Sequence, residues 1–394
     1  MKTEISVRSL PAFSAMLLLL SVVLAWPEAL AGDFDQALRT GSWHLESRLR
    51  YEHVDDDVFA DAEALTLGTR FGYESGAYRG FSVLAELIDV RTLFGVDDFA
   101  PKRPGFAVIA DPSVTTLNRG FLRYQGAYEL EATLGRQRVI YDNARHIGNV
   151  GWRQSEQTFD ALQLGFQPLP GLKLHYAYLD RVRGVTPANK SSLSSHLVHV
   201  EFAATAIGTL SGFGYFLDSG VAGGSRDTVG LRFSGEHAVE NVAIRFAAEY
   251  SAQESGPFDT RYWQLQTALV GYGLEIEVAR ESLGSDAGAS AFQTPLATRH
   301  GFNGWADQFA TTPDDGLVDT WASFKTRLGG FELTARHHWF EADRGGESYG
   351  RETNVQITRG FGEHYRLGAK YADYRSRGFG AGTTKFWLWG EISF

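Results

Sequence analysis

The chain has 394 residues, of which 43% are hydrophobic and 13% aromatic, and it contains 44 glycines but no cysteine. The lack of cysteine excludes a disulfide framework, a cysteine-ligated zinc site, an iron–sulfur cluster and a cysteine nucleophile. The formal net charge of -10 argues against a general nucleic-acid binder, because such proteins need a basic field. The mean hydropathy of -0.21 excludes a protein built from membrane-spanning helices.

The first segment has the pattern of a cleaved secretory signal peptide. Lys2 and Arg8 supply a positive start, an apolar run with four consecutive leucines follows, and small residues on either side of a leucine end the segment at Ala31. The alternative is a membrane anchor, but a spanning helix needs about 20 apolar residues and this run is shorter. We therefore expect residues 1–31 to be removed and residues 32–394 to form a single domain.

The remaining chain alternates between apolar and polar residues with a period of two. In residues 43–52, the odd positions hold mainly tryptophan, leucine and tyrosine, and the even positions hold charged or histidine side chains; residues 65–74, 242–251 and 365–371 alternate in the same way. Such alternation predicts strands with one apolar and one polar face. The strands are about 10–13 residues long, which exceeds the usual length in soluble sheets and suits tilted strands that cross a bilayer.

The connections between these strands alternate between short and long, which is the layout of outer-membrane barrels. In hydrocarbon an unpaired backbone group is costly, so the sheet must close on itself. We therefore predict an all-β fold, a transmembrane antiparallel β-barrel of about 18 strands (16 as the alternative), with short periplasmic turns and long extracellular loops. A soluble β-solenoid or propeller would show shorter strands and an internal repeat, which we do not find. The expected strands are 42–54, 64–75, 79–91, 116–126, 129–140, 158–167, 172–183, 195–205, 209–217, 226–235, 241–252, 260–270, 273–283, 317–328, 330–342, 349–360, 364–375 and 383–394.

The last predicted strand is amphipathic and ends on an aromatic residue. Phe386, Leu388, Ile392 and Phe394 share one face of it. Such an ending resembles the closing strand of outer-membrane barrels, where it serves as the assembly signal. We therefore expect a bacterial outer-membrane location, contact with membrane lipid and lipopolysaccharide, and recognition of this strand by the barrel-assembly machinery.

Two segments carry distinctive sequence motifs rather than ordinary loop sequence. They are GRQRVIYDNARHIGNVGWRQSEQTFD at residues 135–160 and FQTPLATRHGFNGWADQF at residues 292–309. Both resemble the alginate export family of outer-membrane β-barrel proteins, and with the flanking strands the resemblance covers most of the expected domain. It implies an 18-stranded barrel whose long loops restrict a polar, partly basic pore. It also implies passage of uronate-type polysaccharide or of smaller anions.

Basic side chains on the polar faces are the candidate pore-lining residues. In a low-dielectric wall they attract carboxylates, and arginine does so bidentately. We expect the arginine-rich first motif to fold inward as part of the constriction; the alternative is a motif that serves loop packing. Glutamates on the same faces bring the wall near charge balance. The predicted substrate-contacting or pore-lining residues are Arg48, Arg50, Arg70, Arg123, Arg136, Arg138, Arg145, Arg153, Arg245, Arg336 and Lys370.

These features together predict a porin that passes hydrophilic solutes by passive diffusion. The expected solutes are anionic sugars or uronate polymers, and the expected partners include neutral carbohydrate as well. We expect no nucleic-acid partner. The sequence contains no phosphate-binding loop, zinc-protease motif or serine-hydrolase motif. We therefore expect no catalytic residues, no metal and no cofactor. The alternatives are a barrel enzyme of the lipase or protease type and a non-conducting structural or adhesion barrel.

Overall fold

The computed structural model describes residues 31–186, 190–205, 208–218 and 224–394. The predicted signal peptide therefore lies outside the described residues, except for Ala31. Within these ranges, 18 strands form one sheet. They are β1 (Ser42–Asp56), β2 (Ala62–Glu74), β3 (Phe81–Asp98), β4 (Val114–Gln125), β5 (Glu131–Gln137), β6 (Thr158–Leu169), β7 (Leu172–Arg183), β8 (Lys190–Thr205), β9 (Gly208–Leu217), β10 (Arg226–Val239), β11 (Val242–Ser255), β12 (Phe258–Gly271), β13 (Leu274–Leu283), β16 (Leu317–Leu328), β17 (Phe331–Glu341), β18 (Ser348–Phe361), β19 (Tyr365–Ser376) and β20 (Thr383–Ser393).

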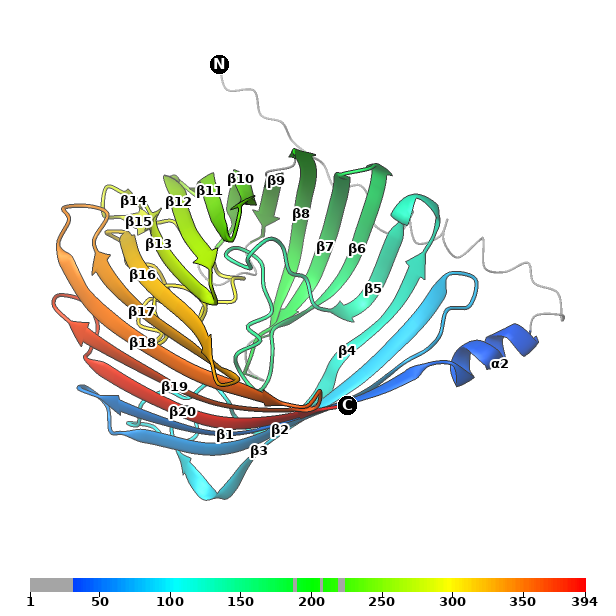
Figure 1. Cartoon of the computed structure of the whole chain (residues 1–394), viewed down its shortest axis with the longest axis horizontal. Helices are drawn as coiled ribbons and strands as arrows, with labels where there is room; N and C mark the ends of the chain where they lie inside the picture. Colours follow the sequence, from blue (N-terminus) through cyan, green and yellow to red (C-terminus); the bar gives the residue numbers. More distant parts are fainter. Residues whose placement is uncertain (1–30, 187–189, 206–207, 219–223) are drawn as a thin grey trace.

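The sheet closes into a barrel because its first and last strands pair. β1 and β20 are antiparallel, with Cα partners from Glu46 and Ser393 at one end to Asp56 and Thr383 at the other. In Figure 1 the red β20 lies between the blue β1 and the red β19. Every other strand pairs antiparallel with its neighbours along the chain. Closure gives the backbone N–H and C=O groups of β1 and β20 hydrogen-bond partners, which a wall in lipid requires.

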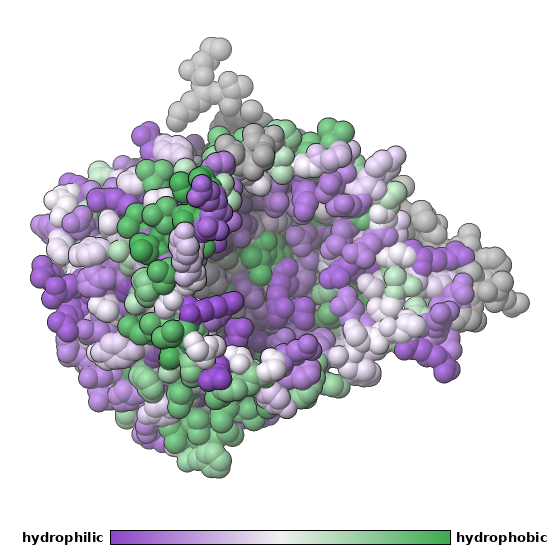
Figure 2. Space-filling view, viewed as in Figure 1, coloured by the Kyte–Doolittle hydropathy of each residue, from purple (hydrophilic) through white to green (hydrophobic). Residues whose placement is uncertain are grey.

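The two faces of the wall differ as the alternation predicts. In β10, Leu231 is 61% exposed while the adjacent Arg232 is 7% exposed. Leu49, Leu134 and Leu265 are likewise exposed on the outer face. An apolar exterior and a polar interior are what a barrel in lipid requires. Figure 2 shows the interior as a central hollow with many hydrophilic side chains around it.

The connections fall into two classes that alternate around the barrel. One end carries tight turns, such as Gly329 and Gly330 between β16 and β17, both with positive φ. The other end carries the long β3–β4 loop (residues 99–113), β5–β6 loop (138–157) and β13–β16 loop (284–316). We assign the end with tight turns to the periplasm and the end with long loops to the cell exterior.

The β5–β6 and β13–β16 loops fold into the barrel and bind each other there. The Gly148 amide donates to the Leu296 carbonyl at 2.9 Å, and the Thr298 amide donates to the Ala144 carbonyl at 3.1 Å. The side-chain amide of Gln157 also donates to the Leu296 carbonyl at 3.0 Å. Two segments far apart in sequence thus form one body inside the lumen, which we call the loop plug.

Apolar side chains fasten the loop plug to the wall. Tyr141, Ile147 and Leu296 are buried in one cluster with residues of β6 to β9. A second buried cluster joins Phe292, Trp305 and Phe309 of the plug to β12 and β17 to β20. Burying a large apolar side chain contributes about 1.5–3 kcal/mol, so these contacts hold the plug firmly in place.

The observed strands confirm the predicted barrel and its count of 18, so the alternative of 16 is wrong. The largest differences in strand bounds are at β3, which runs on to Asp98 instead of residue 91, and at β8, which begins at Lys190 instead of residue 195. A short β14–β15 hairpin (Ser285–Asp286 and Ser290–Ala291) and two short helices, α2 (Ala31–Arg39) and η2 (Ala127–Glu129), lie outside the wall sheet. Among the described residues, no helix is long and apolar enough to span a membrane.

Candidate functional site

Two hollows lie on either side of the loop plug. The outer hollow, of about 700 Å³, is bounded by the extracellular ends of β1 and β20 and by Arg153, Arg299 and Lys385. The inner hollow, of about 420 Å³, is bounded by the periplasmic ends of β1 and β20 and by Arg48 and Gln154. Arg153 and Gln154 are consecutive residues that face opposite hollows. The chain at this point of the β5–β6 loop is therefore the barrier between them.

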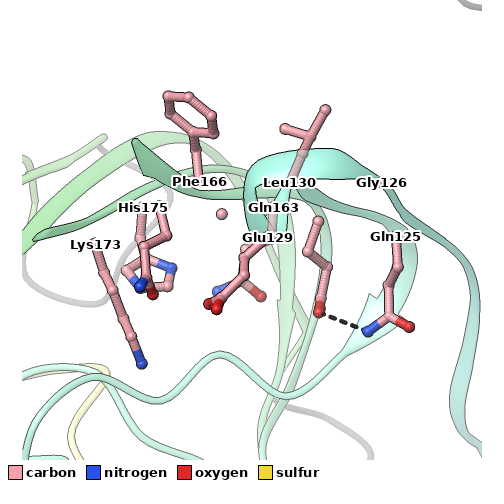
Figure 3. A pocket seen from close by; sticks show the side chains of 11 residues that line it. Gln125, Gly126, Glu129, Leu130, Gln163, Phe166, Lys173 and His175 are labelled. Atoms are coloured by element: carbon pink, nitrogen blue, oxygen red, sulfur yellow. Dashed lines mark hydrogen bonds between the residues drawn. The ribbon is translucent and has the colours of Figure 1, made fainter. Parts of the chain in front are cut away.

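A further pocket lies in the interior wall near the periplasmic end of β4 to β7 (Figure 3). Its volume is about 370 Å³. Lys173, His175 and Gln163 line it, and Gln125 donates to the Glu131 carboxylate at 3.3 Å. This side of the lumen therefore presents hydrogen-bond donors and acceptors together with positively and negatively charged side chains. Such a lining suits hydrated polar solutes.

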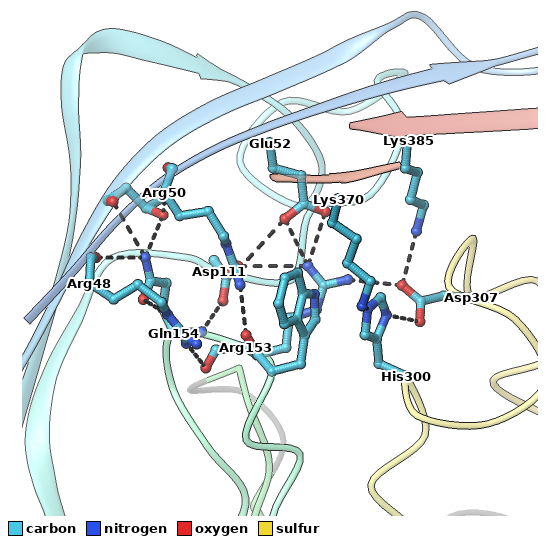
Figure 4. A network of polar contacts seen from close by, with 12 residues as sticks. Arg48, Arg50, Glu52, Asp111, Arg153, Gln154, His300, Asp307, Lys370 and Lys385 are labelled. Carbon is cyan, nitrogen blue, oxygen red and sulfur yellow. Dashed lines mark hydrogen bonds and ion pairs between the residues drawn. The ribbon is translucent and has the colours of Figure 1, made fainter. Parts of the chain in front are cut away.

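Arginines of β1 hold the barrier from the wall side (Figure 4). Arg48 donates to the Gln154 side chain at 3.0 Å and to the Arg153 carbonyl at 2.6 Å. Arg50 is buried and donates to the Trp152 carbonyl at 2.6 Å. Both arginines therefore donate hydrogen bonds from the wall to the loop plug.

A third loop completes this side of the barrier. Asp111 of the β3–β4 loop forms a buried ion pair with Arg50 and accepts the Gln154 amide at 2.6 Å. Arg70 of β2 donates to the Gln154 carbonyl at 3.0 Å. Residue 154 is therefore held by its amide, its carbonyl and its side chain at once, which fixes the barrier in one position.

Arg153 joins the wall to both loops of the plug. Its Nη1 atom lies 3.1 Å from each carboxylate oxygen of Glu52 in β1, and its Nη2 atom donates to Asp307 at 3.0 Å. Asp307 also accepts from Lys385 of β20 at 3.0 Å and from His300 at 2.8 Å. Charged groups buried together in this way stay charged only when each has a partner.

Lys370 of β19 lies at the centre of an aromatic cage. Its ammonium nitrogen is 3.8 Å from the Trp305 ring centroid and 4.1 Å from that of Trp152. It also contacts His300 Nε2 at 2.8 Å. Trp152 belongs to one loop of the plug, and Trp305 and His300 belong to the other. One wall residue therefore binds both loops by cation–π contacts and a hydrogen bond.

The protonation states of the plug follow from these contacts. Burial alone would raise the pKa of the Asp307 carboxyl, but His300, Lys385 and Arg153 hold that pKa well below its usual range. Burial lowers the pKa of His300 to about 3, and although Asp307 opposes this shift, Lys370 and Arg153 reinforce it. Neutral His300 therefore donates from Nδ1 to Asp307 and accepts at Nε2 from Lys370.

We expect acid to loosen the plug through His300. If the β13–β16 loop leaves the barrier, the solvated imidazole regains a pKa near 6.5 and binds a proton that the buried form rejects. Release is therefore favoured as the pH falls below about 6.5, by about 2 kcal/mol at pH 5. Asp307 stays ionised in both states at that pH. Single-channel conductance and current noise should rise between pH 7.5 and pH 5.

The matched variant for this prediction is His300→Gln. Glutamine can donate to Asp307 and accept from Lys370 without titrating. It should keep the neutral-pH conductance and remove most of its pH dependence. An unchanged pH response in this variant would assign the titration to another group.

Two more arginines of the first motif, Arg138 and Arg145, belong to the loop plug, and both have acidic partners. Arg138 forms a bidentate pair with Glu156 at 2.6 and 2.7 Å. Arg145 is buried and binds Glu281 of β13 at 3.0 and 3.1 Å, and Asn303 at 3.1 Å. Arg145 therefore ties the β5–β6 loop to the opposite wall and to the β13–β16 loop.

Three further predicted residues lie on the interior wall away from the barrier. Each forms an ion pair with a glutamate two strands away in the sheet, so none adds an isolated positive charge to the lumen. The pairs are Arg123–Glu74 at 3.0 Å, Arg245–Glu275 at 3.2 Å and Arg336–Glu277 at 3.3 Å.

The structure places Arg136 differently from the prediction. Its register partners are Gly120 of β4 and Asp160 of β6, and it binds the Asp160 carboxylate at 2.7 and 3.0 Å. Leu134, on the same face of β5, is exposed on the outside of the barrel. Arg136 therefore faces away from the lumen. The prediction assigned it to the constriction because it lies in the first motif, although the predicted strand 129–140 already included it and the even positions of β5 point outward.

Sequence reasoning missed the acceptors and rings that organise the barrier. Trp152, Asp307, His300 and Trp305 were not among the predicted residues, although all four lie in the two motif segments. Their concentration of tryptophan, histidine and aspartate in long loops was the available signal. What it could not show is that Asp307 and Arg153, 154 positions apart, would meet.

Comparisons with known proteins identify solved structures with a similar fold. No family model and no curated protein matches the chain. Among solved structures it is similar to Acinetobacter baumannii OccAB2 (TM-score 0.74, 12% identity, covering 91% of this chain and 99% of that one). It is also similar to Pseudomonas aeruginosa OccK9, also called OpdG (0.72, 13%, 91% and 100%), and to P. aeruginosa OpdK (0.72, 15%, 91% and 99%).

The chain has the fold of an outer-membrane porin. At these identities the likeness concerns the fold, and the apolar exterior described above agrees with it. The predicted outer-membrane location is confirmed on this basis. The resemblance to the alginate export family finds no support in the comparisons and rests on the two loop motifs alone.

Proposed function

We propose that the protein is a diffusion channel for small anionic solutes of the size of single sugars or aromatic acids. The observation that carries this proposal is the loop plug, which is bound to β1, β19 and β20 and separates two hollows in the lumen. A barrel of this strand number would otherwise enclose a wide aqueous channel. The narrowing favours small solutes over the uronate polymers that the sequence suggested.

The outer hollow has the composition of a capture site for an anion with an apolar part. Val58, Phe59 and Val108 are exposed along its wall, and Arg299 and Lys385 also line it. Apolar side chains beside a few placed charges are typical of small-molecule sites, and about 700 Å³ is within their usual range. The fold neighbour OpdK was solved with vanillate, which supports aromatic acids beside the uronate-type sugars predicted from the sequence.

Arg299 is the cation that we expect to set anion preference. It donates to the Pro295 carbonyl at 3.0 Å, and within the described part of the chain it forms no ion pair. Its charge is therefore available to a solute. Arg299→Ala should lower the anion-to-cation permeability ratio about twofold, measured as the reversal potential in a salt gradient.

The control for Arg299 is Arg344→Ala, which removes an exposed extracellular charge that neighbours Asp315 and does not line the outer hollow. It should leave the reversal potential unchanged. Equal effects of the two substitutions would indicate that only the general charge of the extracellular side matters.

Liposome swelling tests the proposal as a whole. Vesicles containing the protein should swell in glucuronate and vanillate faster than in neutral sugars of equal size, and an alginate oligomer should not enter. Closed vesicles would contradict a channel. Closed vesicles together with lipid or peptide hydrolysis would favour the alternative of a barrel enzyme.

A further inference from the structure

The outer face of β18 and β19 carries two arginines side by side near the extracellular end. Arg351 and Arg375 are Cα partners in the strand register, and both side chains are exposed. Arg375 binds Asp373 at 2.9 Å. Arg351 forms no hydrogen bond or ion pair with any residue that the structure describes. Like charges directly opposite each other on paired strands are destabilising unless an anion lies between them.

The depth of this pair in the membrane follows from its neighbours. Towards the periplasm, the same face continues through Val355 and Ile357 on β18 and Tyr371 on β19, all exposed. Trp339, the register partner of Arg351 on β17, is also exposed. Tryptophan and tyrosine on the outside of a barrel gather where the hydrocarbon meets the headgroups. The arginine pair therefore borders the apolar band on its extracellular side.

A second arginine on β18 marks the other border. Arg359 lies on the same face as Arg351, with its guanidinium 4.7 Å from the ring centroid of Phe331 and 5.0 Å from that of Phe361. At about 3.3 Å per residue and a tilt of about 40°, the two arginines of β18 are about 20 Å apart along the membrane normal. This separation is close to the height of the apolar band of outer-membrane barrels, about 25 Å.

We propose that Arg351 and Arg375 form a binding site for a phosphate group of lipopolysaccharide in the outer leaflet. Two adjacent guanidinium groups can each donate two hydrogen bonds to phosphate oxygens. A phosphate between them would remove the repulsion across the strand pair, while the acyl chains would lie on the apolar face below. The site lies outside the lumen, so it is independent of the solute that the channel passes.

The test is lipid binding by the detergent-purified protein, followed by native mass spectrometry. The probes are lipid A with two phosphates, dephosphorylated lipid A and phosphatidylglycerol. Lipid A should bind most tightly. The Arg351→Gln, Arg375→Gln double variant should bind it about thirtyfold more weakly, as expected for the loss of two interfacial cations. Arg359→Gln, on the same face at the periplasmic border, should bind it as the wild type does.

The outcomes separate the possible sources of binding. Unchanged lipid A binding by the double variant would overturn the site, and equal binding of phosphatidylglycerol would overturn the choice of lipopolysaccharide. The Arg351→Lys, Arg375→Lys variant retains the charges but not the fork geometry, so an intermediate affinity supports direct phosphate contact. A heat-dependent gel shift confirms that each variant is a folded barrel.

Discussion

Replacing residues 292–313 with two glycines is expected to raise the single-channel conductance severalfold. This segment supplies Trp305, His300 and Asp307 to the barrier, so its removal opens one side of the lumen and frees Arg153 from one partner. Barrels of 16 to 18 strands leave an aqueous channel when loops do not fill it. The measurement is the conductance of single channels in planar bilayers at neutral pH.

The deletion is designed so that the wall need not change. The two ends of the removed segment both lie at Ser285, because Ala291 pairs with Ser285 in the β14–β15 hairpin and the Asp314 carbonyl accepts from its hydroxyl. Two glycines can therefore join Ala291 to Asp314. A conductance like that of the wild type would mean that the β3–β4 and β5–β6 loops set the constriction by themselves.

The wall of this protein could be predicted from sequence because its signal is local. Each strand shows its two faces within about ten residues, and lipid outside with water inside makes the alternation strict. The prediction was less accurate at strand ends: β3 runs on to Asp98, β8 begins at Lys190, and β5 ends at Gln137. Arg136 lay inside the predicted strand 129–140, and it was assigned to the constriction only because the first motif begins at Gly135.

The barrier could be predicted only in part because its bonds are not local. The arginines were identified by their position on polar faces, but their partners lie far away in sequence, such as Glu281 for Arg145 and Glu52 for Arg153. The loops that supply Trp152 and Asp307 have no periodicity, so no pattern gives the direction of their side chains. Consequently the sequence suggested cations available to solutes, whereas the structure shows most of them bound to carboxylates or to the loop plug.

The second large effect is expected from Arg153→Met. The substitution keeps much of the side-chain volume, but among the described residues it leaves the buried Glu52 paired with only the more distant Arg50, 3.7 Å away. Removing one member of a buried ion pair costs about 3–5 kcal/mol. We therefore expect the β5–β6 loop to detach from Asp307 and β1, the conductance to rise and the permeability ratio to shift towards cations. Planar-bilayer recordings in a salt gradient measure both changes.

Two comparisons distinguish a broken charge pair from general damage. The Glu52→Gln, Arg153→Met double variant has no unpaired carboxylate at this position, so it should recover much of the wild-type conductance. Arg327→Met is the control, since it removes an exposed arginine that pairs with Glu332 at the periplasmic end. Because exposed ion pairs contribute little to stability, this variant should conduct as the wild type does. If the double variant conducts as strongly as Arg153→Met alone, the loss of the guanidinium's contacts with the plug, rather than the stranded charge of Glu52, opens the barrier.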